Sequence, residues 1–186
     1  MAETSKHANP WDTHRFCPAC GAAGIEVRAD RSVLCRRCGF HFYFNTAAAV
    51  AGLIEDDIGR LLMIVRAHNP QKGSLDLPGG FVDFDETAED ALKREIKEEL
   101  NLEVKECSYF KSFPNIYNFD GIINRTLDFA FFCTVESFTG QKLSDEVNDA
   151  VFVRPAEINL TRIGFDSIRN MVSAYLRFKE INHHCS

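Results

Sequence analysis

The 186-residue sequence predicts an α/β fold in which a mixed β-sheet lies between helical layers and a small cysteine-rich module precedes it. Three observations lead to this prediction. Strand-like segments come first, then an amphipathic helical stretch, then further strands and a final helix, which is typical of a sheet covered by helices. Two C-x2-C pairs stand near the start of the chain. Hydrophobic residues make up 45% of the chain, enough for one sizeable core plus a small accessory module.

The first element is the cysteine module, formed by the pairs Cys17/Cys20 and Cys35/Cys38, each followed directly by glycine. Two such knuckles are typical of a structural zinc site with four thiolate ligands. Because a closed tetrahedral site has no free coordination position, this Zn2+ would support the fold rather than catalyse a reaction. Two disulfides are the alternative, but they would need an oxidising compartment that nothing in the sequence indicates. The segment between the knuckles alternates as a short β-hairpin would.

The main domain is expected to open with strands at residues 46–54 and 61–66, which flank a turn and form a hairpin that feeds the central sheet. The aromatic linker 41–45 could pack the cysteine module against this domain. A further extended segment at 75–82 contains the turn Pro78-Gly79-Gly80. Downstream we expect strands at 104–113, 122–135 and 151–154, and a closing helix at 164–179.

The central helix is expected from about Thr87 to Leu100, with apolar residues at helical spacing. Glu95, Glu98 and Glu99 project from one face of this helix. Their like charges cost roughly 0.2–0.5 kcal/mol per pair, and they crowd the end where the helix dipole disfavours anions. A divalent cation would offset both penalties, and oxygen ligands without His or Cys suit Mg2+ or Mn2+. A solvated acidic face is the alternative reading.

A longer pattern includes this helix: Gly80, five residues, Glu86, seven residues, then the run Arg94 to Leu102, REIKEELNL. This pattern resembles the signature of the Nudix hydrolase family. The sequence departs from it at Asn101, where the family usually has Gly. The change is mild, because Asn readily adopts the left-handed conformation that a helix C-cap needs. The resemblance implies an α/β/α sandwich and hydrolysis of the pyrophosphate bond in a nucleoside diphosphate linked to another group.

The resemblance also implies roles for individual residues. Glu95, Glu98 and Glu99 would hold the catalytic Mg2+ or Mn2+, and either Glu98 or Glu99 could serve as general base. Arg94 would orient Glu86 through an ion pair. Bound cations neutralise the pyrophosphate and lower the pKa of a bound water. Several Nudix enzymes carry another metal-binding Glu at the position of Glu146, for which an ordinary acidic loop is the alternative.

The resemblance extends to a branch of the family. A four-cysteine module ahead of a Nudix domain is similar to the layout of NADH pyrophosphatases, but their SQPWPFPxS motif is absent, since residues 111–119 read KSFPNIYNF. NAD(H)- or ADP-ribose-like substrates are therefore both expected. Candidate substrate contacts are Phe113, Tyr117 and Phe119, which could stack on an adenine or nicotinamide ring or pack in the core. Gly79 and Gly80 allow close approach of backbone to phosphate or metal, and Arg66 could contact phosphate.

Charge and composition limit the partners. The formal net charge of −6 makes long nucleic acid an unlikely ligand, so a small nucleotide is the expected one. No apolar run approaches the roughly 20 residues of a membrane span, and the start lacks the apolar centre of a signal peptide, so a cytoplasmic protein without membrane contact is expected. A homodimer is left open.

Two other functional classes remain. One is a nucleotide-sensing module with this fold but no turnover. The other is a nucleic-acid adaptor based on the arginine-rich cysteine module, with Arg28, Arg31, Arg36 and Arg37. The predicted organisation is an N-terminal tail at 1–13, a zinc ribbon at 14–44, a Nudix hydrolase domain at 45–181 and a C-terminal tail at 182–186.

Overall fold

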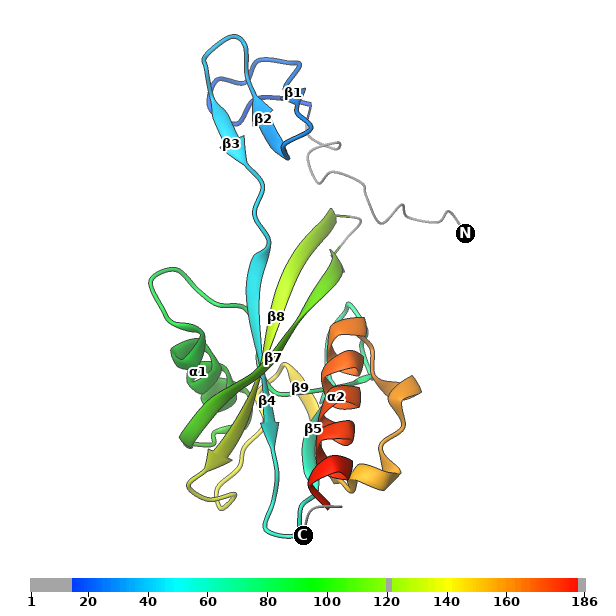
Figure 1. Ribbon diagram of the computed structural model, residues 1–186. Helices are drawn as coiled ribbons and strands as arrows, with labels where there is room; N and C mark the ends of the chain where they lie inside the picture. The colour runs from blue at the N-terminus through cyan, green and yellow to red at the C-terminus, as the bar shows by residue number, and fades with distance from the viewer. Residues whose placement is uncertain (1–14, 120–121, 184–186) are drawn as a thin grey trace.

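The computed structural model describes residues 15–119 and 122–183 (Figure 1). The cysteine ribbon stands at one end of the larger α/β body, joined to it by the chain that enters β4 (Ala47–Ile54) (Figure 1). None of the described helices combines the length and apolar character needed to span a membrane.

The ribbon contains a small antiparallel sheet of β1 (Glu26–Val27), β2 (Ser32–Leu34) and β3 (His41–Tyr43). The β1–β2 pairing confirms the predicted hairpin. The linker prediction was wrong in part, because its first three residues form β3. Phe42 and Tyr43 are 44% and 53% exposed, and the Phe42 ring lies near its neighbours Phe40 and Phe44. These aromatic side chains therefore do not bury themselves against the main domain.

The body contains two three-stranded sheets. The first is mixed: β4 runs parallel to β8 (Ile122–Val135), which pairs antiparallel with β7 (Val104–Phe119). The second is antiparallel, with β5 (Leu61–Arg66) between β6 (Leu75–Asp76) and β9 (Val147–Val153). Helices α1 (Ala88–Leu100) and α2 (Asp166–His183) lie on opposite sides of the sheets (Figure 1). Two short 3-10 helices, Pro155–Glu157 and Leu160–Arg162, precede α2.

Alternating strand residues supply two cores. Val50 and Ile54 of β4 pack towards Ile96 and other apolar residues of α1. The intervening Ala51 and Leu53 pack in the second core with residues of α2, including Met171 and Tyr175. The side chains of β5 are distributed between the two cores in the same way. Leu62 and Ile64 belong to the first core, and Leu61 and Met63 belong to the second. This period-two burial on both faces places the strands between two helical layers, as predicted.

The predicted hairpin of 46–54 with 61–66 was wrong, because β4 and β5 belong to different sheets. The free edge of β4 is occupied instead by residues 78–82. Val50 N–H donates to Gly80 O and Gly52 N–H to Pro78 O, both at 2.8 Å, and Val82 N–H donates to Ala48 O at 3.0 Å. The extended segment expected at 75–82 is therefore split: its start pairs with β5 and its end with β4. This crossover segment, residues 75–82, joins the two sheets.

Gly79 makes the crossover possible. Its φ is +142°, and a Cβ at this position would lie 2.1 Å from the carbonyl oxygen of Val50. Any side chain here would collide with the β4 backbone, so only glycine fits.

Helix α1 closely matches the prediction. Thr87 caps its start, accepting a hydrogen bond from Asp90 N–H at 3.1 Å. Asn101 ends it in the left-handed conformation, with φ 54° and ψ 33°. Other boundaries differ: β7 continues past residue 113 to Phe119, β9 begins at Val147 rather than 151, and α2 runs from 166 to 183 rather than 164 to 179. Strand β7 can contain Pro114 because it is an edge strand, where a missing N–H breaks no pairing.

Candidate active site

A cleft of about 400 Å3 lies between the crossover segment, the acidic face of α1, the β4–β8–β7 sheet and the start of α2; we call it the catalytic cleft. It brings together most of the predicted site residues: Arg66, Gly79, Gly80, Arg94, Glu95, Glu98, Glu99, Tyr117 and Glu146. Glu86 does not line it but contacts Arg94. Phe113 does not line it either and packs against the core beneath α2. The side chain of Phe119 lies outside the described residues.

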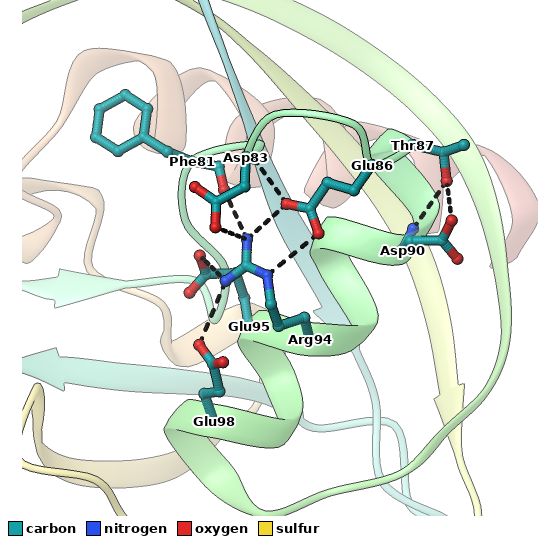
Figure 2. A network of polar contacts seen from close by, with 8 residues as sticks. All are labelled: Phe81, Asp83, Glu86, Thr87, Asp90, Arg94, Glu95 and Glu98. Atoms are coloured by element: carbon teal, nitrogen blue, oxygen red, sulfur yellow. Dashed lines mark hydrogen bonds and ion pairs between the residues drawn. The ribbon is translucent and has the colours of Figure 1, made fainter.

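Arg94 is the centre of a polar network on α1, surrounded by carboxylates (Figure 2). It donates two hydrogen bonds to Glu86, from Nη2 at 2.7 Å and from Nε at 3.2 Å. Nη2 also donates to the carbonyl oxygen of Phe81 at 3.0 Å, while Nη1 donates to Glu95 at 2.8 Å and to Glu98 at 3.3 Å. The paired bonds to Glu86 are the strong, directional kind. Arg94 therefore ties the loop after the crossover segment to the helix and orients Glu95.

Glu86 in turn is fixed from two sides. The Arg94 hydrogen bond, supported by the Asp83 N–H at 2.7 Å, lowers the pKa of the Glu86 carboxyl below its ordinary value. An ionised Glu86 holds the guanidinium in place, so this ion pair orders the entrance of the catalytic cleft.

Glu99 is the most buried acid of the helix, with 7% of its surface exposed. Its Oε2 accepts a hydrogen bond from Gly79 N–H at 2.9 Å. Burial raises the pKa of Glu99 well above its ordinary value, and the nearby carboxylates of Asp76, Glu95 and Glu146 add to the rise. The crossover glycine thus supplies a backbone donor to the acid that burial penalises most.

Glu95 lies beside it and is partly buried. A Cβ at Gly80 would lie 2.5 Å from the Glu95 carboxylate, so the second glycine leaves room for this acid. Burial raises the pKa of Glu95, and the charges of Glu98 and Glu146 act in the same direction against Arg94. Glu98, unlike Glu95 and Glu99, is not buried, because 61% of its side chain is exposed.

These acids are suitable ligands for a hard divalent cation. They offer carboxylate oxygens alone, and neighbouring carboxylates add to the raised pKa of both Glu95 and Glu99, an electrostatic cost that a cation would remove. They are not tightly gathered, however. Within the described residues, the only group of three or more His, Cys, Asp or Glu with all ligand atoms within 4.8 Å is the cysteine cluster of the ribbon.

That cluster comprises Cys17, Cys20, Cys35 and Cys38. The sulfurs of Cys17 and Cys38 lie 3.7 Å apart, as do those of Cys20 and Cys35. A tetrahedron with Zn–S bonds of about 2.3 Å would separate its sulfurs by about 3.8 Å, whereas a disulfide requires about 2.05 Å. The N–H groups of Cys38 and Arg37 point at the Cys35 sulfur and, against the effect of burial, lower its pKa to about 6. The four thiols are free, and their geometry is compatible with Zn2+.

Two of the predicted substrate contacts, Tyr117 and Arg66, also line the cleft. The ring of Tyr117 stacks on Phe165, with centroids 5.5 Å apart, and meets Phe81 edge-on at 5.6 Å. Arg66 is already engaged: its Nη1 donates to Asp76 at 3.0 Å, its Nε donates to Pro70 O at 3.0 Å, and its guanidinium lies over the Phe165 ring.

The cleft-lining residues that the sequence reasoning missed include Asp76, Thr126, Asp128 and Phe165. Asp76 directly precedes the glycine turn, and burial raises its pKa to about 6 despite the ion pair with Arg66. A signal for the β8 pair was available. Thr126 and Asp128 stand at every second position of β8, followed in the same spacing by Ala130 and Phe132. The four side chains therefore share one inward face, on which the next two residues are apolar. Phe165 had no distinguishing signal among sixteen phenylalanines.

A family model described as the NUDIX domain matches residues 45–174. An ADP-ribose pyrophosphatase of Methanocaldococcus jannaschii is 35% identical over 141 residues, which cover 75% of this chain and 79% of that protein. A NAD-capped RNA hydrolase NudC of Pseudomonas syringae is 30% identical over 96 residues, covering 52% of this chain and only 34% of that protein.

Among solved structures, a NUDIX hydrolase from Nitrosomonas europaea matches with a TM-score of 0.69 at 23% identity, covering 91% of this chain and 93% of that one. This likeness shows that the two proteins share a fold. The family model covers the whole body from β4 into α2. The Arg94 network and the buried acids lie in the segment that carries the Nudix signature. The chain therefore belongs to the Nudix hydrolase family.

Proposed function

We propose that this protein hydrolyses the pyrophosphate bond of a nucleoside diphosphate linked to another group, using a divalent cation. The observation that carries the proposal is Glu99. It is buried beside other acids that line the cleft, yet among the described residues its one hydrogen-bond donor is the Gly79 N–H, so its negative charge needs a positive partner. A nucleotide-sensing module without turnover would have no use for such a costly acid.

The roles of the individual residues are part of the proposal. Glu95, Glu98, Glu99 and Glu146 would hold Mg2+ or Mn2+, which when bound would neutralise the pyrophosphate and acidify a water. Arg94 and Glu86 are positioning residues, since they hold Glu95 and the entrance loop in place. Gly79 fixes Glu99 through its N–H, and either Glu98 or Glu99 accepts the proton of the attacking water.

The substrate we favour is ADP-ribose or an NAD(H)-like dinucleotide. The similarity to an ADP-ribose pyrophosphatase covers most of both chains, whereas this chain spans about a third of the NudC relative. The stacked Tyr117 and Phe165 rings supply an aromatic wall suited to a planar base. Arg66 already donates to Asp76 from Nη1 and to Pro70 O from Nε, so a contact with phosphate would use its remaining N–H groups.

The ribbon, assigned to residues 14–44, would carry one structural Zn2+ on its four cysteines, ahead of a catalytic domain at 45–181. Free thiols fit a reducing compartment such as the cytoplasm. The nucleic-acid adaptor is less well supported, because Arg28 and Arg36 both form ion pairs with Glu26, at 3.6 and 2.6 Å. A homodimer stays a prediction.

The test is a substrate panel of ADP-ribose, NADH, NAD, diadenosine polyphosphates, CoA and nucleotide sugars, with products resolved by chromatography at increasing Mg2+ and Mn2+. We expect metal-dependent release of AMP from ADP-ribose or NAD(H). Tight nucleotide binding without turnover at any metal concentration would favour the sensing module. Binding of RNA or DNA with a steep salt dependence would favour the adaptor.

A further inference from the structure

The floor of the catalytic cleft contains two polar groups that the hydrolytic chemistry does not use. Thr126 and Asp128 lie two residues apart on β8, both line the cleft, and they are only 2% and 6% exposed. Among the described residues, neither Thr126 Oγ1 nor Asp128 Oδ1 has a hydrogen-bond partner. A buried polar atom without a partner is destabilising, so a pair of them on one face needs an explanation.

Their neighbours do not supply one. The nearby Asp76 has partners for both oxygens: Arg66 donates to Oδ2 and Leu77 N–H to Oδ1. The one cation at this end of the cleft, among the residues described, is thus bound to Asp76 and leaves Asp128 unmatched. The negative charges of Asp76 and Asp128 act on each other, which makes this floor unfavourable for a phosphate. The floor therefore suits a neutral or cationic part of a ligand that donates hydrogen bonds.

The aromatic residues define the shape of that part. Tyr117 and Phe165 stack against each other and line the same cleft as the β8 pair, and Asn115, opposite Thr126 in the β7–β8 pairing, lies beside them. Aromatic walls hold planar rings. An ionised carboxylate only accepts hydrogen bonds, whereas a threonine hydroxyl can also donate one. An acceptor next to a donor, beside aromatic rings, complements a nucleobase edge that carries an amino group next to an unprotonated ring nitrogen.

We propose that Thr126 and Asp128 form the base-recognition end of the cleft and select adenine through its amino group and the adjacent ring nitrogen. This inference rests on the proposed hydrolase function and names the specificity residues of the same site. Asp128 accepts a hydrogen bond from the amino group, and Thr126 donates one to the ring nitrogen. Hypoxanthine carries a carbonyl and an N–H at these positions, so its carbonyl oxygen would face the carboxylate and its N–H would face the hydroxyl.

The first experiment compares kcat/KM for ADP-ribose with that for its hypoxanthine analogue, IDP-ribose. We expect the wild-type protein to prefer ADP-ribose by about ten- to a hundredfold, mainly through KM, since the hydrogen bond from the amino group to Asp128 is replaced by a carbonyl oxygen that faces the carboxylate. In Asp128→Asn the side-chain amide can donate to the hypoxanthine carbonyl, so the preference should fall towards one. Thr126→Val should raise KM for ADP-ribose about tenfold with little change in kcat.

The control is Asp149→Asn, the same substitution on an exposed position of β9 outside the cleft lining, and it should keep the wild-type preference. Melting temperatures report whether each variant folds. If Asp128→Asn does not fold, the wild-type preference and Thr126→Val still decide the question. A wild-type ratio near one, or a ratio unchanged in both β8 variants, would overturn the proposal.

A second experiment separates base recognition from hydrolysis. Calorimetry of AMP and IMP binding to wild-type protein without divalent metal reads the base site alone. Tighter binding of AMP, lost in Asp128→Asn, supports the recognition pair even if no substrate in the panel is hydrolysed, in which case only the hydrolase function fails. Equal or undetectable binding of the two nucleotides overturns the recognition pair even in an active enzyme.

Discussion

The four thiols of the ribbon and the four cleft glutamates proposed as cation ligands, Glu95, Glu98, Glu99 and Glu146, are held differently. The ribbon sulfurs all lie within 4.8 Å of one another, and backbone N–H groups already point at Cys35. The cleft carboxylates are spread out: Glu99 is buried against Gly79, Glu95 is bound to Arg94, and Glu98 is mostly exposed.

Local sequence accounts for the difference. A C-x2-C knuckle places two sulfurs on one tight turn, so two turns suffice to build the ribbon cluster. The acids come from the face of one helix and a distant loop before β9, and they repel one another. The ribbon site is therefore shaped by backbone geometry, whereas the cleft acids are positioned in part by Arg94 and, in the proposed function, by a cation.

The largest effect should come from removing the ribbon metal. The ribbon is too small to bury a core of its own, so its folding should depend on Zn2+, and protein purified without added zinc should carry about one zinc per chain. Cys17→Ser should lose that zinc, together with the dispersed NMR resonances of residues 15–44. Cys107→Ser, in the β7–β8 pair, is the control and should retain it. A wild-type ribbon that stays folded after chelation would contradict the assignment.

The next largest effect, a loss of turnover, is expected from substitution of the cleft acids. Glu98→Gln and Glu99→Gln should each lower turnover by about two orders of magnitude or more, as when an interaction made in the transition state is lost. Without metal, Glu99→Gln should raise the melting temperature because it removes a buried charge, whereas Glu98→Gln should leave it nearly unchanged because Glu98 is exposed. Glu89→Gln, exposed in the first turn of α1, is the matched control. Near-normal turnover in both active-site variants would leave only a solvated acidic face.

A smaller effect is expected at the aromatic wall. Tyr117→Ala should weaken substrate binding by about 1–3 kcal/mol, on the scale of a base stacking on an aromatic ring. Phe113→Ala serves as the comparison: because Phe113 packs in the core, that change should lower the melting temperature and leave KM unaffected. If Tyr117→Ala melts earlier with an unchanged KM, the ring serves packing alone.

The smallest effect concerns the end of α1. Asn101 holds the left-handed C-cap and its Nδ2 donates to Gly140 O at 3.0 Å. Asn101→Ala should lower the unfolding free energy by about 1 kcal/mol, because alanine adopts this conformation less readily. Asn101→Gly should fall closer to wild type, since glycine tolerates the conformation but loses the hydrogen bond. Chemical denaturation measures both; alanine more stable than glycine would contradict this reading.

The sequence predicted the structure best where the pattern of residues is local and periodic. The span of α1, its left-handed cap and the ribbon hairpin follow from nearby residues, and the ion pair of Arg94 with Glu86 was expected from the family resemblance. Pairing between distant strands could not be predicted as well from the sequence. Nothing in residues 46–66 indicates that the edge of β4 pairs with residues that follow β5 in the chain. The same limit hid Asp76, whose surroundings form only when the crossover segment and β8 meet in one cleft.

The crossover segment has a consequence for how the molecule moves. Gly80 O and Pro78 O accept hydrogen bonds from β4 while the preceding residues pair with β5, so one continuous stretch of backbone links both sheets at the cleft. The two sheets therefore cannot separate at the cleft unless these hydrogen bonds break. Substrates of different size must then be accommodated by side-chain rotation at the rim, and the amides of Val50 and Gly52 should exchange with deuterium only when the whole domain opens.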